Sequence, residues 1–255
     1  MDDEAVAGNK KNARRRKAWI LFQDESGVSE RPPVRRTWAP KGETPVLVYA
    51  FNWKKLSISA ALGYRWDGKR CRLWFQTQPG SYNDERLIAF VRDLKKHLRG
   101  QKAILIWDGL PAHKSRKMKQ YLESQRGWLE VETLPGYSPD LNPVEDLWSN
   151  IKGQELANRC VAGLGEAEDG VSSGMDRVRQ SMLPFSFLHH AGLFFDPSCH
   201  PITRGSLREL PNLPTNCPGQ GKLWSAGANP ETCRGRNSTQ RCKVAASVSC
   251  FSRPR

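Results

Sequence analysis

The chain has 255 residues, enough for one large domain or two modest ones, and its formal net charge is +14 at pH 7. Neither an apolar signal peptide nor an apolar run of membrane length occurs, so we expect a protein of a reducing cytoplasm without a membrane partner. The basic excess suggests a polyanionic partner such as nucleic acid.

The basic excess is concentrated at the two ends of the chain. Residues 201–255 carry nine basic and two acidic groups (+7), and residues 1–17 carry six and three (+3). The segment between them therefore has a net charge of only +4. Because basic flanks are commonly just solvated, the total charge alone does not identify a nucleic-acid-binding protein.

The apolar patterns predict a mixed α/β domain in the first two thirds of the chain. The run at 102–107 is almost wholly apolar, which favours a buried parallel strand. The helix at 83–97 repeats apolar residues along one side. The elements expected in chain order are strands at 18–23, 45–51, 55–64 and 70–77, a helix at 83–97, a strand at 102–107, a helix at 115–125, a strand at 128–133 and a helix at 143–156. The strands at 45–51, 55–64 and 70–77 are expected to form a meander.

The composition changes after about residue 196. Residues 201–255 contain six prolines, five glycines and four cysteines without a sustained apolar period, so we expect this tail to be disordered. Four thiolates can hold zinc, but these cysteines include no C-x-x-C pair, which favours free thiols. They are Cys217, Cys233, Cys242 and Cys250.

Three acids are placed where a metal site would need them. Asp24 and Asp108 each follow an apolar strand-like run, and Glu145 stands at the start of the helix at 143–156. The carboxyl ends of parallel strands open on one crevice, so acids from different strands meet there. Mg²⁺ and Mn²⁺ prefer carboxylate oxygens, and without a cation three clustered carboxylates would repel one another. The pattern therefore predicts a divalent metal site.

Each acid also has an ordinary structural interpretation. Asn142 and Pro143 suit the N-cap and first position of a helix, so Glu145 could be a capping-box acid. Its angular position beside the apolar stripe of the helix favours a cleft instead, whereas Asp146 points away and is expected to be solvated. Asp24 could be a strand-end turn acid, and its neighbour Glu25 competes with it, because adjacent strand residues face opposite sides of a sheet.

The residues around these acids resemble the bacterial insertion-sequence branch of the mariner-type DDE transposases. The segments that carry the resemblance are Phe22-Gln-Asp24-Glu-Ser-Gly with Arg35-Arg-Thr-Trp-Ala-Pro-Lys-Gly, Leu105-Ile-Trp-Asp108-Gly-Leu-Pro-Ala-His113-Lys-Ser, and Leu134-Pro-Gly-Tyr-Ser-Pro-Asp-Leu-Asn-Pro-Val-Glu145-Asp-Leu-Trp-Ser-Asn-Ile-Lys152. The interval between Asp108 and Glu145 is 36 residues (145 − 108 − 1), in keeping with the family's short second spacing. The resemblance covers about residues 18–195.

The resemblance implies a ribonuclease H-like α/β fold, a mixed central sheet flanked by helices. It implies that Asp24, Asp108 and Glu145 are catalytic and bind two Mg²⁺ ions, for which Mn²⁺ can substitute. The implied reaction is hydrolysis of a phosphodiester at a transposon end, followed by strand transfer of the freed 3′-hydroxyl into target DNA. The implied partners are double-stranded DNA, both transposon ends and target, and a second copy of the chain in a homodimer on DNA. The implied location is the bacterial nucleoid.

Five further residues are candidates for DNA contact. Arg35 and Arg36 lie between the first acid and the next strand, and Lys114 and Arg116 follow the second acid, so these groups could clamp phosphates beside the scissile bond. An exposed helix face is an equal alternative for the second pair. His113 could support the metal site, contact a phosphate, or be an ordinary surface histidine.

These observations divide the chain into a basic remnant or linker at 1–17, a catalytic domain at 18–195 and a tail at 196–255. Seventeen residues are too few for the helix-turn-helix modules that family members usually carry before the catalytic domain. We therefore expect either a separate helix-turn-helix polypeptide or a truncated copy. A non-catalytic relic or regulatory fragment that assembles with intact transposase, and a structure-specific nuclease, are the alternative functions.

Overall fold

The structure is a computed structural model that describes residues 11–50, 54–135, 139–191 and 241–245. A short helix at 11–16 precedes the first strand. The remaining elements are β1 (Trp19–Ser29), β2 (Val46–Ala50), β3 (Lys55–Tyr64), β4 (Cys71–Pro79), α2 (Asp84–Leu98), β5 (Ala103–Trp107), α3 (Arg116–Ser124), β6 (Leu129–Thr133), the 3₁₀ turn η1 (Pro139–Leu141), α4 (Pro143–Gln154), α5 (Leu164–Arg179), α6 (Leu183–His190) and β7 (Arg241–Ala245).

Five strands form one mixed sheet in the order β4-β3-β1-β5-β6. β1, β3 and β4 are an antiparallel meander, whereas β5 and β6 continue from β1 in parallel. β1 is therefore the central strand, where the antiparallel half of the sheet meets the parallel half. In α/β sheets, ligand sites commonly lie in the crevice outside the carboxyl ends of the parallel strands.

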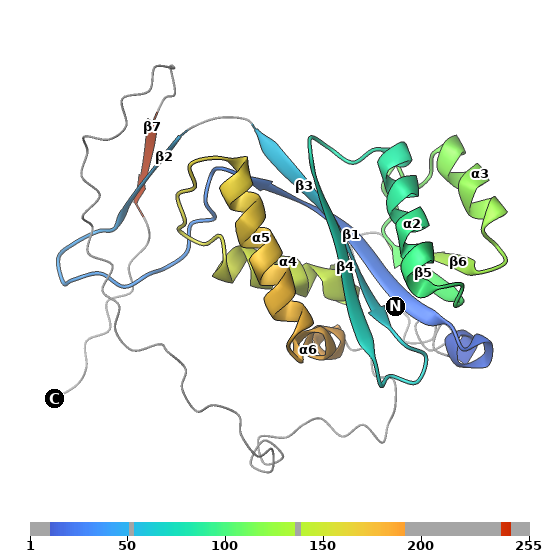
Figure 1. Cartoon of the computed structure of the whole chain (residues 1–255). Coiled ribbons are helices and arrows are strands. Elements are labelled where there is room, and N and C mark those ends of the chain that lie inside the picture. Colours follow the sequence, from blue (N-terminus) through green and yellow to red (C-terminus); the bar gives the residue numbers. More distant parts are fainter. Residues whose placement is uncertain (1–10, 51–53, 136–138, 192–240, 246–255) are drawn as a thin grey trace, which may run out of the picture.

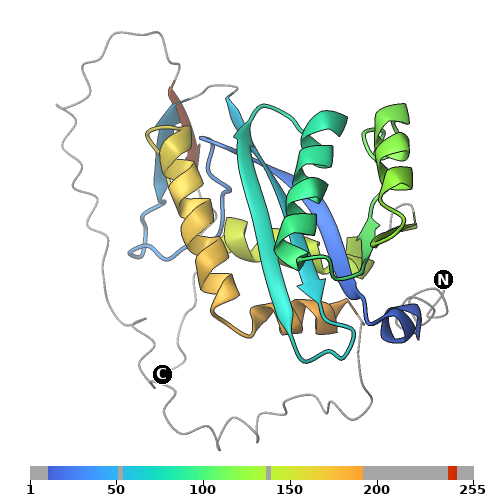
Figure 2. The same ribbon diagram turned by 45° about the vertical axis from the view of Figure 1, so that its right-hand side comes forward.

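Helices cover both faces of this sheet, so the domain has three layers (Figure 1). α2 and α3 pack on one face, against side chains such as Trp19 and Leu21 of β1. α4, α5 and α6 pack on the other face, against Ile20 and Phe22. The turned view shows α5 running along the sheet beside β4 (Figure 2). Alternate residues of β1 thus enter two separate cores, as strand geometry requires.

Three helices begin at polar N-caps that satisfy free backbone N–H groups. The side chains of Asn83, Ser115 and Asn142 accept hydrogen bonds from the N–H groups of Arg86, Met118 and Val144 in the first turns of α2, α3 and α4. These caps fix the starts of the helices expected from the sequence. Within the described ranges, no helix combines the length and the apolar character needed to cross a membrane.

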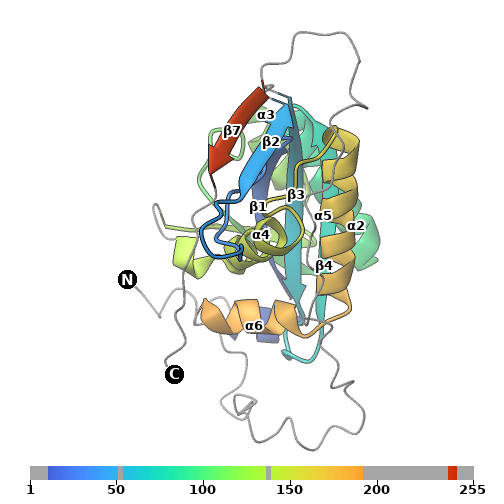
Figure 3. The ribbon, with the colours of Figure 1, turned by 90° about the vertical axis from the view of Figure 1, so that its left-hand side faces the viewer.

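The predicted order of elements is confirmed for most of the sheet, but the role of β2 was predicted wrongly. β2 does not join the meander; it pairs antiparallel with β7 in a separate two-stranded ribbon (Figure 3). The meander is instead made by β1, β3 and β4. The five residues of β7 belong to the predicted disordered tail, most of which lies outside the described residues.

β1 was also predicted too short. It runs for 11 residues to Ser29 because its antiparallel pairing with β3 continues past Asp24, which lies opposite Ala60. Asp24 is therefore inside a strand and not at a strand end. In addition, α5 and α6 follow the last element expected from the sequence.

Candidate active site

The candidate crevice lies where β5 ends beside β1. At the last paired position of these parallel strands, Phe22 of β1 lies opposite Ile106 of β5. Asp24 follows Phe22 by two residues, and Asp108 follows Ile106 by two residues. β1 continues, bonded only to β3 in the described sheet, whereas β5 ends at Trp107. Beside Asp24, the edge of β1 that faced β5 is therefore unpaired within the described strands. Asp108 follows β5 on this side of β1.

Asp24 is a nearly buried acid on the face covered by α4. Its side chain accepts a hydrogen bond of 2.8 Å from the indole Nε1 of Trp148, and the residue is 9% exposed. Burial raises the pKa of Asp24 to about 7, assisted by the negative charges of Glu145 and Glu25 and opposed by the Trp148 hydrogen bond. Glu145 of α4 is therefore close enough for its charge to act on Asp24.

Glu145 stands in the first turn of α4 without a capping role. A capping-box acid would accept a hydrogen bond from the backbone N–H of the N-cap residue. Here the N–H of Asn142 donates to the carbonyl of Pro139 at 2.9 Å. Glu145 is exposed and borders an open cavity of about 500 Å³. Its neighbour Asp146 is only half-exposed and lies 3.3 Å from His190, so it is not simply solvated as the sequence suggested.

Asp108 is held by His113. The imidazole Nδ1 lies 2.8 Å from Asp108 Oδ1 and 2.9 Å from the carbonyl oxygen of Asp108. The ring stacks on Trp107, with centroids 4.2 Å apart and planes 4° apart. Burial works to raise the pKa of Asp108, but hydrogen bonds from His113 and the N–H of Leu110 outweigh it and hold that pKa below its usual range. Asp108 is thus ionised and fixed.

His113 is itself fixed on its other side by Glu25. Its Nε2 lies 3.5 Å from Glu25 Oε1, an ionic contact too long for a good hydrogen bond. Burial works to lower the pKa of His113, but the two acids outweigh it and raise that pKa to about 9. The imidazole is therefore protonated at neutral pH. Because His113 is only 5% exposed, this placement favours positioning of Asp108 over the phosphate contact considered from the sequence.

Asp24 and Glu25 lie on opposite faces of the sheet. Asp24 contacts Trp148 of α4, whereas Glu25 accepts a 2.6 Å hydrogen bond from Gln23 and lies near His113. Sequence reasoning treated Glu25 only as a competitor of Asp24. Glu25 contacts His113, and His113 contacts Asp108. This series of contacts joins a strand to a loop, and the spacing of the three residues along the chain does not predict it.

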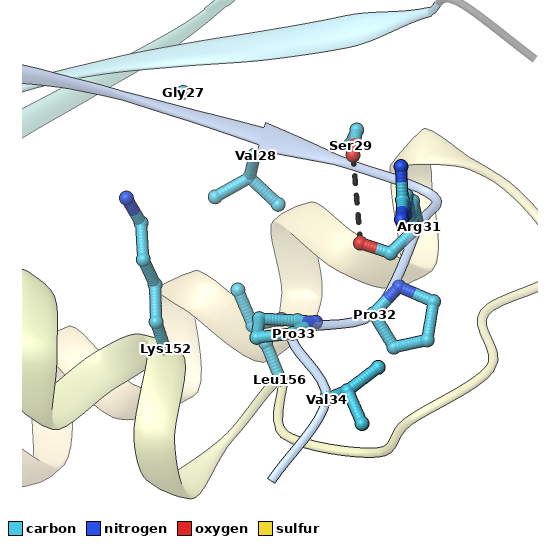
Figure 4. Close-up of a pocket in the computed structure, with 9 residues that line it drawn as sticks. All are labelled: Gly27, Val28, Ser29, Arg31, Pro32, Pro33, Val34, Lys152 and Leu156. Atoms are coloured by element: carbon cyan, nitrogen blue, oxygen red, sulfur yellow. Dashed lines mark hydrogen bonds between the residues drawn. The ribbon is translucent and has the colours of Figure 1, made fainter. Parts of the chain in front are cut away.

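Lys152 is a functional candidate that sequence reasoning missed. It lies seven residues after Glu145, two turns along the same face of α4. Burial lowers the pKa of Lys152, while the nearby charges of Glu145 and Asp24 act to raise it. Its side chain points into a cavity of about 460 Å³ between β1 and the loop after it (Figure 4). Its spacing of seven residues from Glu145 is the sequence feature that could have identified Lys152.

The basic candidates for DNA contact differ in their surroundings. Arg35 and Arg36 are exposed in the loop between β1 and β2. Lys114 is exposed, and its positive charge helps to lower the pKa of Asp108. Its ammonium also lies over Gly109, where an added Cβ would be 2.8 Å from it. Arg116 is exposed in the first turn of α3.

The donor chemistry suits a hard divalent cation. Carboxylates are the ligands that Mg²⁺ and Mn²⁺ prefer, and the carboxylate of Asp24, whose pKa is raised first by burial and then by the charges of Glu145 and Glu25, is a ligand of this kind. Within the described ranges, no three acidic, histidine or cysteine side chains are grouped closely enough to hold an ion. The charge of Glu145 acts on Asp24, while Asp108 Oδ1 is engaged by His113.

A mixed five-stranded sheet between two helical layers, with acids at the opening beside its central strand, defines a ribonuclease H-like α/β protein, as the resemblance implied. Residues 19–164 match the model of a protein family described as DDE superfamily endonuclease. The chain belongs to this family.

Among solved structures, the chain is similar to three of the Mos1 transposase. These are a paired-end complex with the left transposon end (19% identity, 77% of this chain and 65% of that chain, TM-score 0.46), the strand transfer complex (17%, 75% and 59%, 0.47) and the catalytic domain of the mariner transposase (17%, 77% and 98%, 0.39). The chain thus spans slightly less than two thirds of the longer Mos1 chains. No curated protein matches it in sequence.

Proposed function

We propose that this chain is the catalytic domain of a DNA transposase, which hydrolyses a phosphodiester at a transposon end and transfers the freed strand end to target DNA. The observation that carries the proposal is the nearly buried carboxylate of Asp24, which lies under α4 within reach of the charges of Glu145 and the half-buried Lys152. Membership of the DDE superfamily endonuclease family supports the same reaction class.

In this proposal Asp24, Asp108 and Glu145 hold two Mg²⁺ ions, which Mn²⁺ can replace. When bound, such a pair activates the attacking oxygen and stabilises the leaving oxygen of an in-line displacement. Trp148 orients the Asp24 carboxylate, and the His113 and Glu25 pair orients that of Asp108. Lys152 places a positive charge beside the acids, where a scissile phosphate would need a partner.

The exposed basic groups would position the DNA. Arg35, Arg36, Lys114 and Arg116 carry charges suited to backbone phosphates on either side of the reacting bond. We propose that the working form is a homodimer on double-stranded DNA in the bacterial nucleoid.

The experiment that tests the proposal is metal-dependent nicking of labelled duplexes that carry the repeats flanking the gene. We expect cleavage with Mg²⁺ or Mn²⁺ by the native chain and a loss of at least ~100-fold in Glu145→Gln, which keeps the shape but removes the charge needed to bind a divalent cation. Asp146→Asn is the matched control, because it neutralises the next acid along α4, and it should retain cleavage within about threefold.

Any of three results would overturn the proposal. Equal activity of Glu145→Gln and the native chain would remove Glu145 from the site. No cleavage by the native chain, even with a helix-turn-helix partner supplied, would favour a non-catalytic fragment that assembles with intact transposase. Preferential cleavage of an RNA–DNA hybrid would indicate a structure-specific nuclease.

A further inference from the structure

The loop between β1 and β2, residues 30–45, presents Trp38 to solvent. Trp38 is 78% exposed, more than any other large apolar side chain in the described part of the chain. Exposing an indole forgoes the apolar burial that usually retains tryptophan in a core, typically ~2–3 kcal/mol. Core packing therefore does not account for tryptophan at this position.

The loop is anchored a few residues before Trp38. Asn158, at a left-handed φ of 56°, accepts a 2.9 Å hydrogen bond from the N–H of Arg35 and donates one of 2.9 Å to the carbonyl of Arg35. Its own N–H donates to the carbonyl of Pro33 at 3.0 Å. Trp38 thus stands three residues from a fixed point, within about 11 Å of it even if the chain is fully extended.

The anchored part of the loop forms one wall of the cavity into which Lys152 points. Pro33 and Val34 line this cavity of about 460 Å³ together with residues of β1 (Figure 4). Lys152 in turn lies beside Asp24 and Glu145. The cavity therefore lies between Lys152 and the base of the loop that carries Trp38.

The charges around Trp38 suit a polyanion. Arg35, Arg36 and Lys41 are exposed on the same loop, against one exposed acid, Glu43. Exposed cations that flank an exposed aromatic ring are the combination that binds single-stranded nucleic acid, since the cations bind phosphates and the ring stacks on a base. Inside a duplex both faces of each base are covered by its neighbours. Away from the duplex ends, only an unpaired base offers a free face to an indole.

We propose that Trp38 is a base-stacking residue that binds an unpaired base of the DNA strand held at the crevice, while Arg35 and Arg36 bind its phosphates. This inference rests on the proposed function for its substrate and adds a contact to a base. It predicts that the chain distinguishes DNA with an unpaired tail at the end from fully paired DNA.

The test measures equilibrium binding of the full chain in EDTA, where no cleavage interferes. The probes are a fluorescein-labelled duplex with a short unpaired thymine tail, the same duplex with abasic sugars in the tail, and a blunt duplex. The variants are Trp38→Ala, Trp38→Phe, and Val48→Ala as a control that truncates another exposed apolar side chain of the same region.

We expect Trp38→Ala to weaken binding of the thymine-tailed duplex by ~5- to 100-fold, the range of one lost base–aromatic stack. Trp38→Phe should retain most of the affinity, and Val48→Ala should match the native chain. On the abasic probe the native chain should bind as weakly as Trp38→Ala, and the substitution should have no further effect. Binding in EDTA does not depend on catalysis, so these results stand apart from the cleavage test.

Three results would overturn the proposal. The first is an unchanged affinity of Trp38→Ala for the tailed duplex. The second is an equal loss on tailed, abasic and blunt probes, which would assign Trp38 to loop structure or backbone contact. The third is a change in sedimentation of the DNA-free protein without a change in DNA affinity, which would assign Trp38 to contact between copies of the chain.

Discussion

At the scale of single residues, Asp24 is the acid whose properties depend most on the fold. Its carboxylate is enclosed by β1 and α4, and this burial, assisted by the charge of Glu145, raises its pKa to about 7. A carboxylate in this environment is stabilised when it binds either a proton or a metal cation. The same enclosure that destabilises the charged form in the absence of metal therefore favours metal binding.

The pH dependence of stability follows from this pKa. The folded-state pKa of about 7 lies above the ordinary aspartate value of 3.8, so between these values the folded protein binds more protons than the unfolded chain. In EDTA, the stability contributed by Asp24 is therefore fully present below about pH 4 and is lost as the pH rises towards 7. Asp24→Asn should remove this dependence.

We expect Asp24→Asn in EDTA at pH 8 to raise the free energy of unfolding by roughly 2–4 kcal/mol, about 5–10 °C in Tm, because it removes a poorly solvated charge and keeps an acceptor for Trp148. Thermal unfolding followed by circular dichroism measures this. The exposed acid Asp140 provides the control, since Asp140→Asn should leave Tm unchanged. A lower Tm for Asp24→Asn would contradict the burial argument.

The three acids could be proposed from the sequence because each follows or begins an element with a strong pattern. Lys152 could have been proposed as well, from its spacing to Glu145. The contact between Glu25 and His113 could not be predicted from the sequence. It depends on tertiary structure, because His113 stacks on Trp107 and its loop lies beside β1. Trp38 stands in a segment that carries the family resemblance, but its exposure could not be predicted, since exposure is a property of the folded loop.

At the scale of elements, the close contact between α4 and α5 determines how α4 is held over Asp24. It depends on Gly174, where an added Cβ would lie 2.7 Å from Ile151 Cδ1 and 2.8 Å from the Glu155 carboxylate. Glu155 is in turn paired with Arg177 of α5 at 2.7 Å. The absence of a side chain at Gly174 therefore lets α5 approach α4.

We expect Gly174→Ala to destabilise the fold by about 1–3 kcal/mol, because the added methyl group overpacks the contact between the helices. Gly165 in the same helix is the matched control: an added Cβ there meets nothing within 4 Å. Gly165→Ala should be neutral or stabilising by up to about 1 kcal/mol, as expected from helix propensity. Urea denaturation of both variants measures the difference, and equal effects would refute the packing argument.

The elements that were predicted and those that were missed differ in the strength of their local patterns. α2 and β5 have regular apolar periods and were predicted within a residue or two. α5 contains glycines at 165, 170 and 174, which are poor helix formers, so its stability comes from packing that no local pattern records. β2 has a strand pattern, but its pairing with β7 joins segments almost two hundred residues apart, which local patterns do not specify.

At the scale of the whole molecule, the five-stranded sheet and its helices form a unit in which β7 takes no part. β7 pairs only with β2, in a ribbon separate from the main sheet. We therefore propose that residues 18–195 contain the folding unit, as the composition change near residue 196 suggested.

A chain that ends at residue 195 should unfold in a single cooperative transition with a Tm within about 2 °C of the full chain, since both cores remain intact. Circular dichroism and differential scanning calorimetry on the two proteins measure this. A shortened chain that is aggregated, or that lacks a cooperative transition, would show that residues beyond 195 stabilise the sheet.

The central position of β1 has a consequence for how the chemistry could be lost. Because successive residues of β1 alternate between two cores, a slip of one residue against β3 would bring Glu25 to the α4 face and take Asp24 to the other. The same slip would move Ile20 and Phe22 out of one core and Trp19 and Leu21 out of the other. The burial of these four apolar side chains therefore determines which acid lies on the face of the sheet covered by α4. A deletion of one residue before Asp24 would place Glu25 on that face instead, although neither acid would itself be substituted.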